Sequence, residues 1–291
     1  MKLGFVGVGK IATSVIEGIF KAKINVKEII LSPKNNTNGK LLKNKFKKII
    51  IAKSNQEVLD KSNWVVLSIT PKVGRQILKK LKFNKNHTIL NFISTIHNSE
   101  LKRIIFPAKK VFKVAPLPMI KYNLGPIIIY PKNKSVEKFF SRLGEVFSTN
   151  DEKENKKLWV MTSFMATYLE IFNTAAKWLQ NKNINKMRSI KYLSNLFKGL
   201  NHELSVNYKP NNDKLIKDFQ TKGGINEELL LRVKKLGVFK NLNKSFEKIY
   251  FRIKKIKDIK SLFSISILFF YILVFDVFDY LHLTKIQSHL L

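Results

Sequence analysis

Near its N-terminus the chain reads Lys2-Leu3-Gly4-Phe5-Val6-Gly7-Val8-Gly9-Lys10-Ile11-Ala12, and this stretch decides the fold prediction. An apolar strand runs directly into a Gly-x-Gly-x-x-Ala turn, and residues 11–20 then have helical apolar spacing. In such a unit the first glycine permits the tight turn, the second lets a pyrophosphate approach the backbone, and the alanine keeps the helix close to the sheet. Because the N–H groups at the helix start face the phosphates, the stretch predicts a dinucleotide site formed by Gly7, Gly9, Lys10, Ile11 and Ala12.

Strands and helices alternate over the first half of the chain. Strand-like runs are expected at 3–7, 28–32, 48–52, 64–70, 88–94, 111–115 and 126–130. Helices are expected at 56–61, 74–81, 99–106 and 136–147. This order predicts βαβ units in a parallel, Rossmann-type sheet over residues 1–150.

Only helices are expected after about residue 151. The segment 158–179 is apolar on most faces, so we expect it to be buried on most sides, in part against another subunit. Further helices are expected at 187–204 and at 226–237, where Asn226 is a plausible N-cap. The predicted fold class is therefore α/β followed by all-α, with a helical dimerisation and substrate domain at 151–240.

The tail, residues 241–291, is basic at first and then apolar. Residues 261–275 carry no charge, and a longer apolar stretch to residue 284 is interrupted by Asp276 and Asp279. A membrane span needs about 20 mostly apolar residues, so membrane contact through 261–284 is one expectation. A buried helix and sequence foreign to the original domain are the alternatives. Because the first strand starts at Lys2, no signal peptide is expected, and the predicted location is cytoplasmic.

The net charge of +34 does not by itself indicate a nucleic-acid partner. Of the 54 basic residues only six are Arg, and these do not cluster, whereas base recognition favours Arg. The many Lys residues would instead help to attract phosphate or carboxylate ligands. The chain has no Cys, and its five His residues lack metal-ligand spacing, so no metal site is expected.

The ends of two predicted strands offer further cofactor contacts. An Asp or Glu that binds a free ribose 2′-OH is missing after the second strand, where Ser32, Lys34 and Asn35 would suit a 2′-phosphate. This favours NADP(H) over NAD(H), the alternative being a solvated turn. After the fourth strand, the segment Ile69-Thr70-Pro71-Lys72 would border the same crevice, unless it is an ordinary strand-to-helix turn.

A second glycine-containing turn lies at Thr221-Lys222-Gly223-Gly224-Ile225-Asn226. The paired glycines relax the backbone before a helix, whose first N–H groups can hold a carboxylate. The alternative is structural, because Glu227 and Glu228 would interact favourably with the same helix dipole.

Together these motifs resemble the pyrroline-5-carboxylate reductases over about residues 1–240. The matching segments are Gly4–Gly9 with Ala12, Thr70-Pro71-Lys72, the run Lys113-Val114-Ala115-Pro116-Leu117-Pro118, and Thr221–Gly224. The resemblance implies a Rossmann domain with a helical dimerisation domain and a homodimer or larger ring. It also implies NAD(P)H-dependent reduction of a cyclic imine, 1-pyrroline-5-carboxylate, to proline.

The resemblance also implies roles for individual residues. Pro116 would approach the nicotinamide, and the substrate would contact Thr221, Gly223, Gly224, Ile225 and Asn226. The family's Gly-Ser-Gly-Pro-Ala-Tyr segment is Ser163–Tyr168 here, with only the Tyr kept, and the Asn-Thr of the family's loop before Pro118 is missing. The polar groups predicted to be catalytic are Asn226, Tyr168 and Thr162.

The sequence is also compatible with two alternatives. A hydroxyacid-type or deazaflavin-linked NADP dehydrogenase shares the first domain, and Lys177 would then be the nearest candidate for its catalytic Lys. A non-catalytic NADP-binding scaffold would bind the cofactor without turnover.

Overall fold

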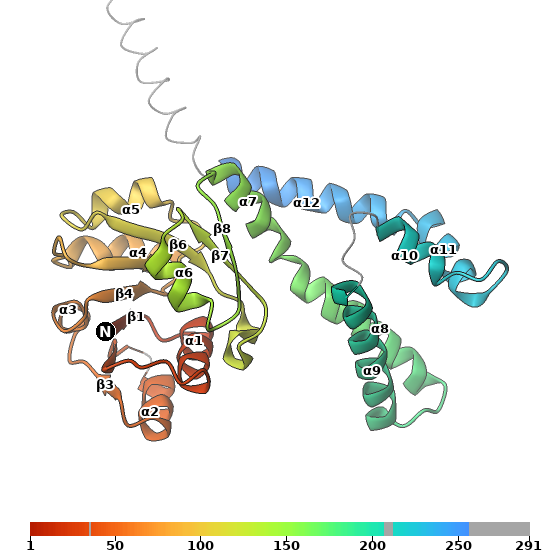
Figure 1. Cartoon of the computed structure of the whole chain (residues 1–291), viewed down its shortest axis with the longest axis horizontal. Helices are drawn as coiled ribbons and strands as arrows, with labels where there is room; N and C mark the ends of the chain where they lie inside the picture. The colour runs from red at the N-terminus through yellow and green to blue at the C-terminus, as the bar shows by residue number, and fades with distance from the viewer. Residues whose placement is uncertain (35, 207–211, 256–291) are drawn as a thin grey trace, which may run out of the picture. The chain divides into compact units, whose positions relative to one another are not determined.

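The computed structural model describes residues 1–34, 36–206 and 212–255. The chain forms two compact units. The first unit comprises Met1–Trp159 and also includes the end of the last described helix from Phe251 onward, and the second comprises Val160–Tyr250 (Figure 1).

The first unit is an α/β domain built on one sheet. Eight strands of the described chain pair in the order β3-β2-β1-β4-β5-β6-β7-β8. All neighbouring pairs are parallel except β6 and β7, which confirms the predicted Rossmann-type sheet. The strands are β1 (Lys2–Val6), β2 (Glu28–Leu31), β3 (Ile49–Ile51), β4 (Trp64–Leu67), β5 (Thr88–Asn91), β6 (Lys110–Ala115), β7 (Pro126–Tyr130) and β8 (Glu145–Ser148).

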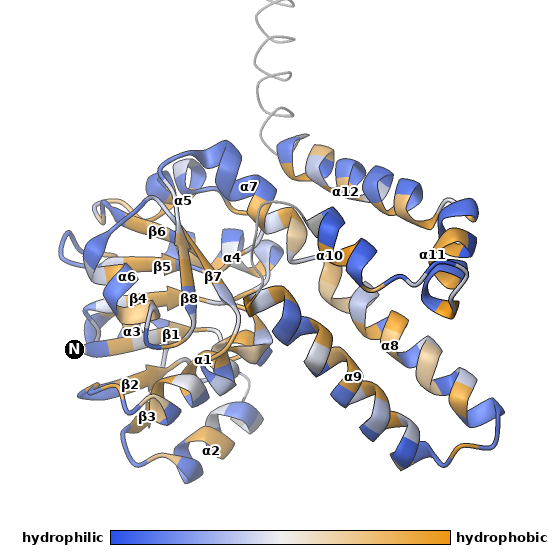
Figure 2. Cartoon of the chain, turned by 45° about the vertical axis from the view of Figure 1, so that its right-hand side comes forward, coloured by the Kyte–Doolittle hydropathy of each residue, from blue (hydrophilic) through white to orange (hydrophobic). Residues whose placement is uncertain are grey.

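Helices cover both faces of this sheet, which explains why the central strands are apolar along their whole length. One buried cluster packs α1 (Lys10–Lys21), α2 (Asn36–Lys45) and α6 (Lys134–Phe140) on one face. A second cluster packs α3 (Asn55–Asp60), η1 (Leu78–Lys80) and α5 (Asn98–Ile104) on the other. Figure 2 shows the strands as the most hydrophobic part of this unit. The elements α4 (Pro71–Ile77) and η2 (Pro118–Tyr122) complete it.

The C-terminal end of α1 is closed by residues that come much later in the chain. A Cβ atom at Gly18 would lie 2.5 Å from the backbone oxygen of Ile120, so only glycine permits this approach. The Asn123 side-chain amide donates to the Gly18 oxygen at 3.0 Å, and the Arg142 guanidinium donates to the Ala22 oxygen at 2.7 Å. The first bond adds a second donor to the Gly18 oxygen, which also accepts from the Ala22 N–H at 2.8 Å, and the second gives the Ala22 oxygen at the helix end a partner.

Residues 136–147 do not form a single helix, so that prediction is wrong at its C-terminal end. The helix α6 ends at Phe140, and Glu145–Ser148 instead forms β8, parallel to β7. Gly144 marks the change, because a Cβ atom there would lie 2.5 Å from the backbone oxygen of Gly125. The close approach of these two backbones turns the chain into the sheet.

The second unit is helical, as predicted. Its helices continue from α7 and are α8 (Phe164–Asn181), α9 (Lys186–Val206), α10 (Asn212–Asp218), α11 (Ile225–Lys235) and α12 (Val238–Lys255), while α7 (Glu152–Met161) belongs mostly to the first unit. The helix predicted over 158–179 is in fact two helices, because the chain turns at Thr162 and Ser163. There the Ser163 hydroxyl donates to the backbone oxygen of Val160 at 2.6 Å.

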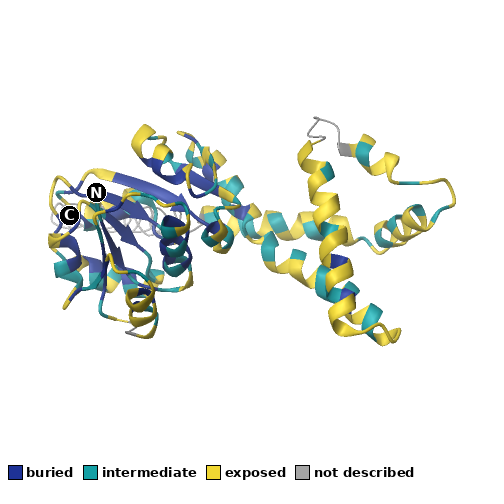
Figure 3. Cartoon of the chain, turned by 60° about the horizontal axis from the view of Figure 1, so that its bottom comes forward, coloured by how far each residue is buried: buried dark blue, intermediate teal, exposed yellow. Residues whose placement is uncertain are grey.

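Most of the helical unit is exposed within a single chain (Figure 3). Only Ala176 of α8 is buried, while Leu169, Ile171 and Trp178 are exposed, so burial of this helix on most sides is wrong for the chain alone. Among the described residues no helix has the length and apolar character needed to cross a bilayer. The apolar segment 261–284 lies outside the described residues.

His87, which lies just before β5, gives the first unit a pH-dependent stability. Its side chain is buried, its Nδ1 accepts from the backbone N–H of Asn84 at 3.2 Å, and its Nε2 lies 3.1 Å from the backbone oxygen of Leu59. Burial lowers the pKa of His87 below its usual 6.5. The unfolded chain therefore binds more protons than the folded one as the pH falls through this range, and stability decreases.

We expect the free energy of unfolding, measured by urea denaturation, to fall as the pH is lowered from about 7 to about 5. His87→Asn should lose less stability over this range than the wild type. His202→Asn, which removes an exposed histidine, serves as the matched control. An equal pH dependence in wild type and His87→Asn would contradict the prediction.

Candidate functional site

The glycine turn after β1 is held by close backbone packing. Gly7 has φ +97°, and a Cβ atom there would lie 2.4 Å from the backbone oxygen of Ser68 and 2.5 Å from the side chain of Ile69. Gly7 is therefore required by the fold itself. In contrast, a methyl group at Gly9 would have no protein atom within 4 Å, so the space beside Gly9 is open.

The start of α1 is suited to an anion. Gly9 is its N-cap and provides no side-chain cap, and the first turn contains no acidic residue. The first N–H groups of a helix have no helical partner, and the helix dipole favours negative charge there. Ala12 is fully buried and keeps the helix close to the sheet. Open space beside Gly9 at an uncapped helix start fits a pyrophosphate, as the sequence predicts.

Ser32 lies at the end of β2, where the sequence places the ribose of the cofactor. Its hydroxyl is buried and accepts a hydrogen bond from the N–H of Gly7 at 3.0 Å, so it joins the strand end to the glycine turn. Lys34 is exposed close by in the chain, whereas Asn35 lies outside the described residues. Asn38 was not predicted to take part in this site. Its amide donates to the backbone oxygen of Val8 at 2.9 Å and so links α2 to the same turn.

The end of β4 lies beside the glycine turn. Ile69 packs beside Gly7, and Thr70 is the N-cap of α4, with Pro71 at the first helical position. Lys72 is exposed in the first turn of this helix. Pro116 is buried directly after β6. Since β1 and β4 are neighbours while β2 and β3 lie on the other side of β1, the glycine turn is at the topological switch point where such sheets bind ligands.

Replacing Ser32 by Ala tests the bond to the glycine turn. Loss of this acceptor leaves the Gly7 N–H without its partner, which should cost about 1–3 kcal/mol of stability and should loosen the turn. We therefore expect Ser32→Ala to bind NADPH more weakly, as measured by fluorescence titration. Asn133→Ala removes the cap of α6 at a similar expected cost of about 0.5–2 kcal/mol, and NADPH affinity should not change. Equal affinities in the two variants would contradict a role for Ser32 in the turn.

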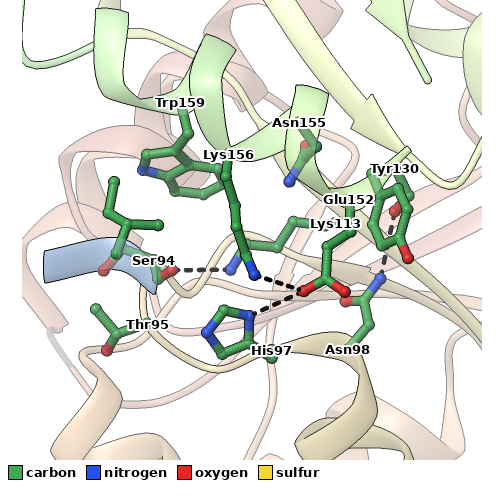
Figure 4. Close-up of a pocket in the computed structure, with 11 residues that line it drawn as sticks. Ser94, Thr95, His97, Asn98, Lys113, Tyr130, Glu152, Asn155, Lys156 and Trp159 are labelled. Carbon is green, nitrogen blue, oxygen red and sulfur yellow. Dashed lines mark hydrogen bonds and ion pairs between the residues drawn. The ribbon is translucent and has the colours of Figure 1, made fainter. Parts of the chain in front are cut away.

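A cavity of about 70 Å³, lined mostly by residues with polar side chains, lies beside β6 in the same unit (Figure 4). Lys113, from the middle of β6, is buried, and its ammonium donates to the backbone oxygens of Ile93, Ser94 and Ile96. The Trp159 ring lies 4.6 Å from the Lys113 nitrogen. Burial lowers the pKa of Lys113 from 10.5 to about 7.

Further polar groups surround this cavity. The Glu152 carboxylate lies 3.2 Å from the Lys156 ammonium and 3.5 Å from Nδ1 of His97. The Asn155 side chain is buried at the cavity wall, and its Oδ1 has no hydrogen-bond partner in the described part of the chain. The sequence reading gave this cluster no role, although a Lys inside an apolar central strand is a signal, because Lys is almost never fully buried without partners.

The turn predicted to hold a substrate carboxylate has its own internal contacts. The helix α11 starts at Ile225 with Gly224 as its N-cap, so the prediction that Asn226 is the N-cap is wrong. Gly223 has φ +72°, and the Gly224 N–H donates to the backbone oxygen of Thr221 at 2.8 Å. The Asn226 amide donates instead to the backbone oxygen of Phe219 at 3.0 Å.

A carboxylate from the protein already binds at this turn. Glu227 accepts from the N–H of Gly223 at 2.7 Å, and Glu228 pairs with Arg232 at 2.7 Å. The internal contact of Glu227 corresponds to the structural alternative for this turn, and a ligand carboxylate would have to compete with Glu227 for the Gly223 N–H.

The other predicted catalytic groups lie on or next to α8. Tyr168 packs against the rings of Phe164 and Phe197, and its hydroxyl accepts from the Asn201 amide at 3.2 Å. Thr162 lies in the turn before α8, and Lys177 is exposed near the end of that helix. Within the described residues no group of His, Asp and Glu side chains has the arrangement of a metal site.

Comparison with known proteins agrees with this geometry. Residues 2–96 match the family model described as "NADP oxidoreductase coenzyme F420-dependent". Pyrroline-5-carboxylate reductase 3 of Danio rerio is 29% identical over 119 residues, which cover 40% of this chain and 41% of that relative. The matched part thus spans about two fifths of the curated relative's length.

Two solved structures extend the similarity of fold to most of the chain. The 1-pyrroline-5-carboxylate reductase of Streptococcus pyogenes has a TM-score of 0.76 and is 19% identical, covering 88% of this chain and 98% of that chain. The Plasmodium falciparum pyrroline carboxylate reductase with NADP bound also has a TM-score of 0.76, at 18% identity, with the same coverage. The chain therefore resembles the pyrroline-5-carboxylate reductases, in sequence over 119 residues and in fold over most of its length.

Proposed function

We propose that the protein is an NADPH-dependent oxidoreductase that reduces a cyclic imine carboxylate, 1-pyrroline-5-carboxylate, to proline. The observation that carries this proposal is the open space beside Gly9 at the uncapped start of α1, in a fold similar to that of the pyrroline-5-carboxylate reductases. Reduction of the C=N bond needs a hydride, which bound NADPH supplies.

The choice of NADP(H) over NAD(H) rests on the end of β2. No carboxylate follows this strand, and Lys34 provides a positive charge there for a 2′-phosphate. One of the similar crystal structures contains NADP. The pyrophosphate would lie at Gly9, with Lys10, Ile11 and Ala12 at the helix start, and Ile69, Thr70 and Lys72 would border the rest of the cofactor.

The substrate is proposed to bind at the turn of residues 221–226. Its carboxylate would accept from the backbone N–H groups at Gly223 and Gly224, in competition with Glu227 at the first and with the Thr221 oxygen at the second. Asn226, Tyr168 and Thr162 are the polar groups proposed to contact the ring and the imine nitrogen. Little acid–base apparatus is needed, because a protonated imine is already a good hydride acceptor and positioning supplies much of the rate.

A homodimer is proposed through α8 and α9. Along α9, Tyr192, Leu196, Leu200 and Leu204 recur every four residues and therefore lie on one face of the helix, where all four are exposed in the single chain. Such an exposed apolar stripe is typical of a surface that a second copy covers.

The test uses the full-length protein and follows the absorbance of NADPH in the presence of 1-pyrroline-5-carboxylate or one of a panel of related cyclic imines. Rapid oxidation with the five-membered imine acid supports the proposal. NADPH binding without turnover of any imine would contradict it and favour a non-catalytic scaffold, which the occupation of the Gly223 N–H by Glu227 independently favours. The variant Lys177→Ala is assayed with the same substrates, because a hydroxyacid-type enzyme would lose activity with this change and an imine reductase would not.

A further inference from the structure

The loop that follows β5 has backbone carbonyls that converge on one buried cation. The oxygens of Ile93, Ser94 and Ile96 all accept from the ammonium of Lys113, the last two at 3.1 and 3.2 Å. Three carbonyls use all three N–H donors of a Lys side chain. The cation therefore binds the loop at several points, and no donor is left for a ligand.

The other walls of the cavity keep the Lys113 side chain in place. Trp159, from α7, covers its nitrogen at 4.6 Å, and cation–π attraction of this kind strengthens away from water. Asn91, the β5 residue paired with Lys113 in register, donates to the Ile96 oxygen at 2.9 Å and accepts from the Ile93 N–H at 3.0 Å. The same loop backbone is thus bound from β5 and from β6.

This loop borders the crevice where a dinucleotide is expected. The sheet order places β5 beside β4, and β4 beside β1 with its glycine turn. A dinucleotide whose pyrophosphate lies at the glycine turn extends across the carboxyl ends of the neighbouring parallel strands. The loop of residues 92–97 continues from the carboxyl end of β5, so its conformation shapes that part of the crevice.

We propose that Lys113 is a positioning residue for the cofactor: its buried ammonium holds the loop of residues 92–97 in the conformation that receives the dinucleotide. The part of this inference that concerns the cofactor rests on the function proposed above, whereas the part that concerns the loop conformation does not. A neutral amine has one N–H donor fewer and a lone pair that would face a carbonyl oxygen, so loss of the charge should release the loop.

The charge of Lys113 changes near neutral pH. Burial lowers its pKa to about 7, so the ammonium is present below about pH 7 and is lost above it. The other titratable or charged groups that line the cavity are His97 on the loop, Tyr130 on β7, and Glu152 and Lys156 on α7. Burial, with the charges of Glu152 and Asp151, raises the pKa of Tyr130 above 10, so its phenol stays neutral at neutral pH.

The experiment compares Lys113→Met and Lys113→Arg with the wild type. Met removes the charge and the three N–H donors while filling a similar space, so the loop carbonyls lose this partner. Arg keeps its charge at every accessible pH, and the cavity of about 70 Å³ beside Lys113 gives its larger head room. Lys110→Met removes an exposed Lys from the same strand and serves as the matched control.

The first measurement is hydrogen–deuterium exchange of the peptide that covers residues 92–98, without any cofactor. At about pH 6 we expect faster exchange in Lys113→Met than in the wild type, Lys113→Arg or Lys110→Met. At about pH 8 the wild type should approach Lys113→Met, while Lys113→Arg stays protected. Equal exchange in the wild type and Lys113→Met at about pH 6 would overturn the proposal.

The second measurement is the Kd for NADPH over the same pH range. Lys113→Met should bind about tenfold more weakly at about pH 6, and the wild type should weaken as the pH rises through about 7, whereas Lys113→Arg should not. The ionisation of the NADPH phosphate affects all variants alike, so the comparison between them removes it. Unchanged affinity together with faster exchange would overturn the link to the cofactor. If the wild type binds no NADPH, the proposed function is wrong, while the exchange measurement still decides whether Lys113 holds the loop.

Discussion

Replacing Gly9 by Ala is expected to abolish tight NADPH binding while the protein stays folded. The methyl group has no protein atom within 4 Å, and the backbone at Gly9, with φ −83° and ψ −174°, is accessible to Ala. The added carbon would instead occupy the space through which a pyrophosphate approaches the start of α1. We expect the Kd for NADPH to rise by roughly a hundredfold or more, which corresponds to about 2.7 kcal/mol.

Gly7→Ala is the matched control for this prediction. Its Cβ atom would lie 2.4 Å from the Ser68 oxygen, at a φ of +97° that disfavours a side chain. This variant should therefore lose thermal stability, whereas Gly9→Ala should melt close to the wild type. Thermal unfolding and fluorescence titration of both variants separate the two effects. Tight NADPH binding by Gly9→Ala would exclude the glycine turn as the pyrophosphate site.

Placing a charge on the apolar face of α9 is expected to convert a dimer into single chains. Leu196 is 45% exposed in the chain alone, so Leu196→Asp should cost the fold of one chain little. In a dimer the same carboxylate would be buried in an apolar interface without a partner, at a cost of several kcal/mol. We expect the mass measured by light scattering to fall from that of two chains or more to that of one.

Ser194→Asp provides the control for the interface. It introduces the same charge two residues away on the same helix, at an exposed position that points to a different side of α9. Its mass should remain that of the wild type. A wild-type mass equal to one chain would refute the proposed dimer, and an unchanged mass in Leu196→Asp would show that the interface lies elsewhere.

The sequence predicted the sheet well because its strands are buried on both faces. Short continuous apolar runs such as those of β1 and β4 are typical of strands that are buried on both faces of a parallel sheet. The prediction failed where local pattern and tertiary contact disagree. Val136, Phe139, Phe140 and Leu143 have helical spacing, but the packing of Gly144 on Gly125 ends the helix and begins a strand.

The helix α2 was not predicted from the sequence, and another segment was predicted wrongly, for different reasons. The helix α2 has only Leu41 and Leu42 as apolar residues, and only Leu42 is buried, so its apolar pattern is weak. The segment 158–179 was predicted as one buried helix because its apolar residues are dense. The density of apolar residues did not indicate burial within the chain, since Leu169 and Trp178 are exposed.

The candidate site could be predicted only where chemistry is encoded locally. Glycine turns such as the one at Gly7 and Gly9 can be recognised from neighbouring residues in the sequence. The bond from Ser32 to Gly7 joins residues 25 positions apart, and the cluster at Lys113 joins β6 to the loop after β5. Such contacts depend on the order of the strands in the sheet, and the pattern of apolar residues along the sequence does not specify that order.

The contacts of Asn123 and Arg142 with the end of α1 affect how the first domain folds during its synthesis. Asn123 and Arg142 bind carbonyls 105 and 120 positions earlier, so the domain depends on contacts between distant parts of the chain. Contacts of this range slow folding, because a long loop must close before they form. A nascent chain that has emerged only through residue 96, the part that matches the family model, carries the whole glycine turn without these partners. During synthesis the cofactor domain should therefore become protease-resistant only after Arg142 has left the ribosome.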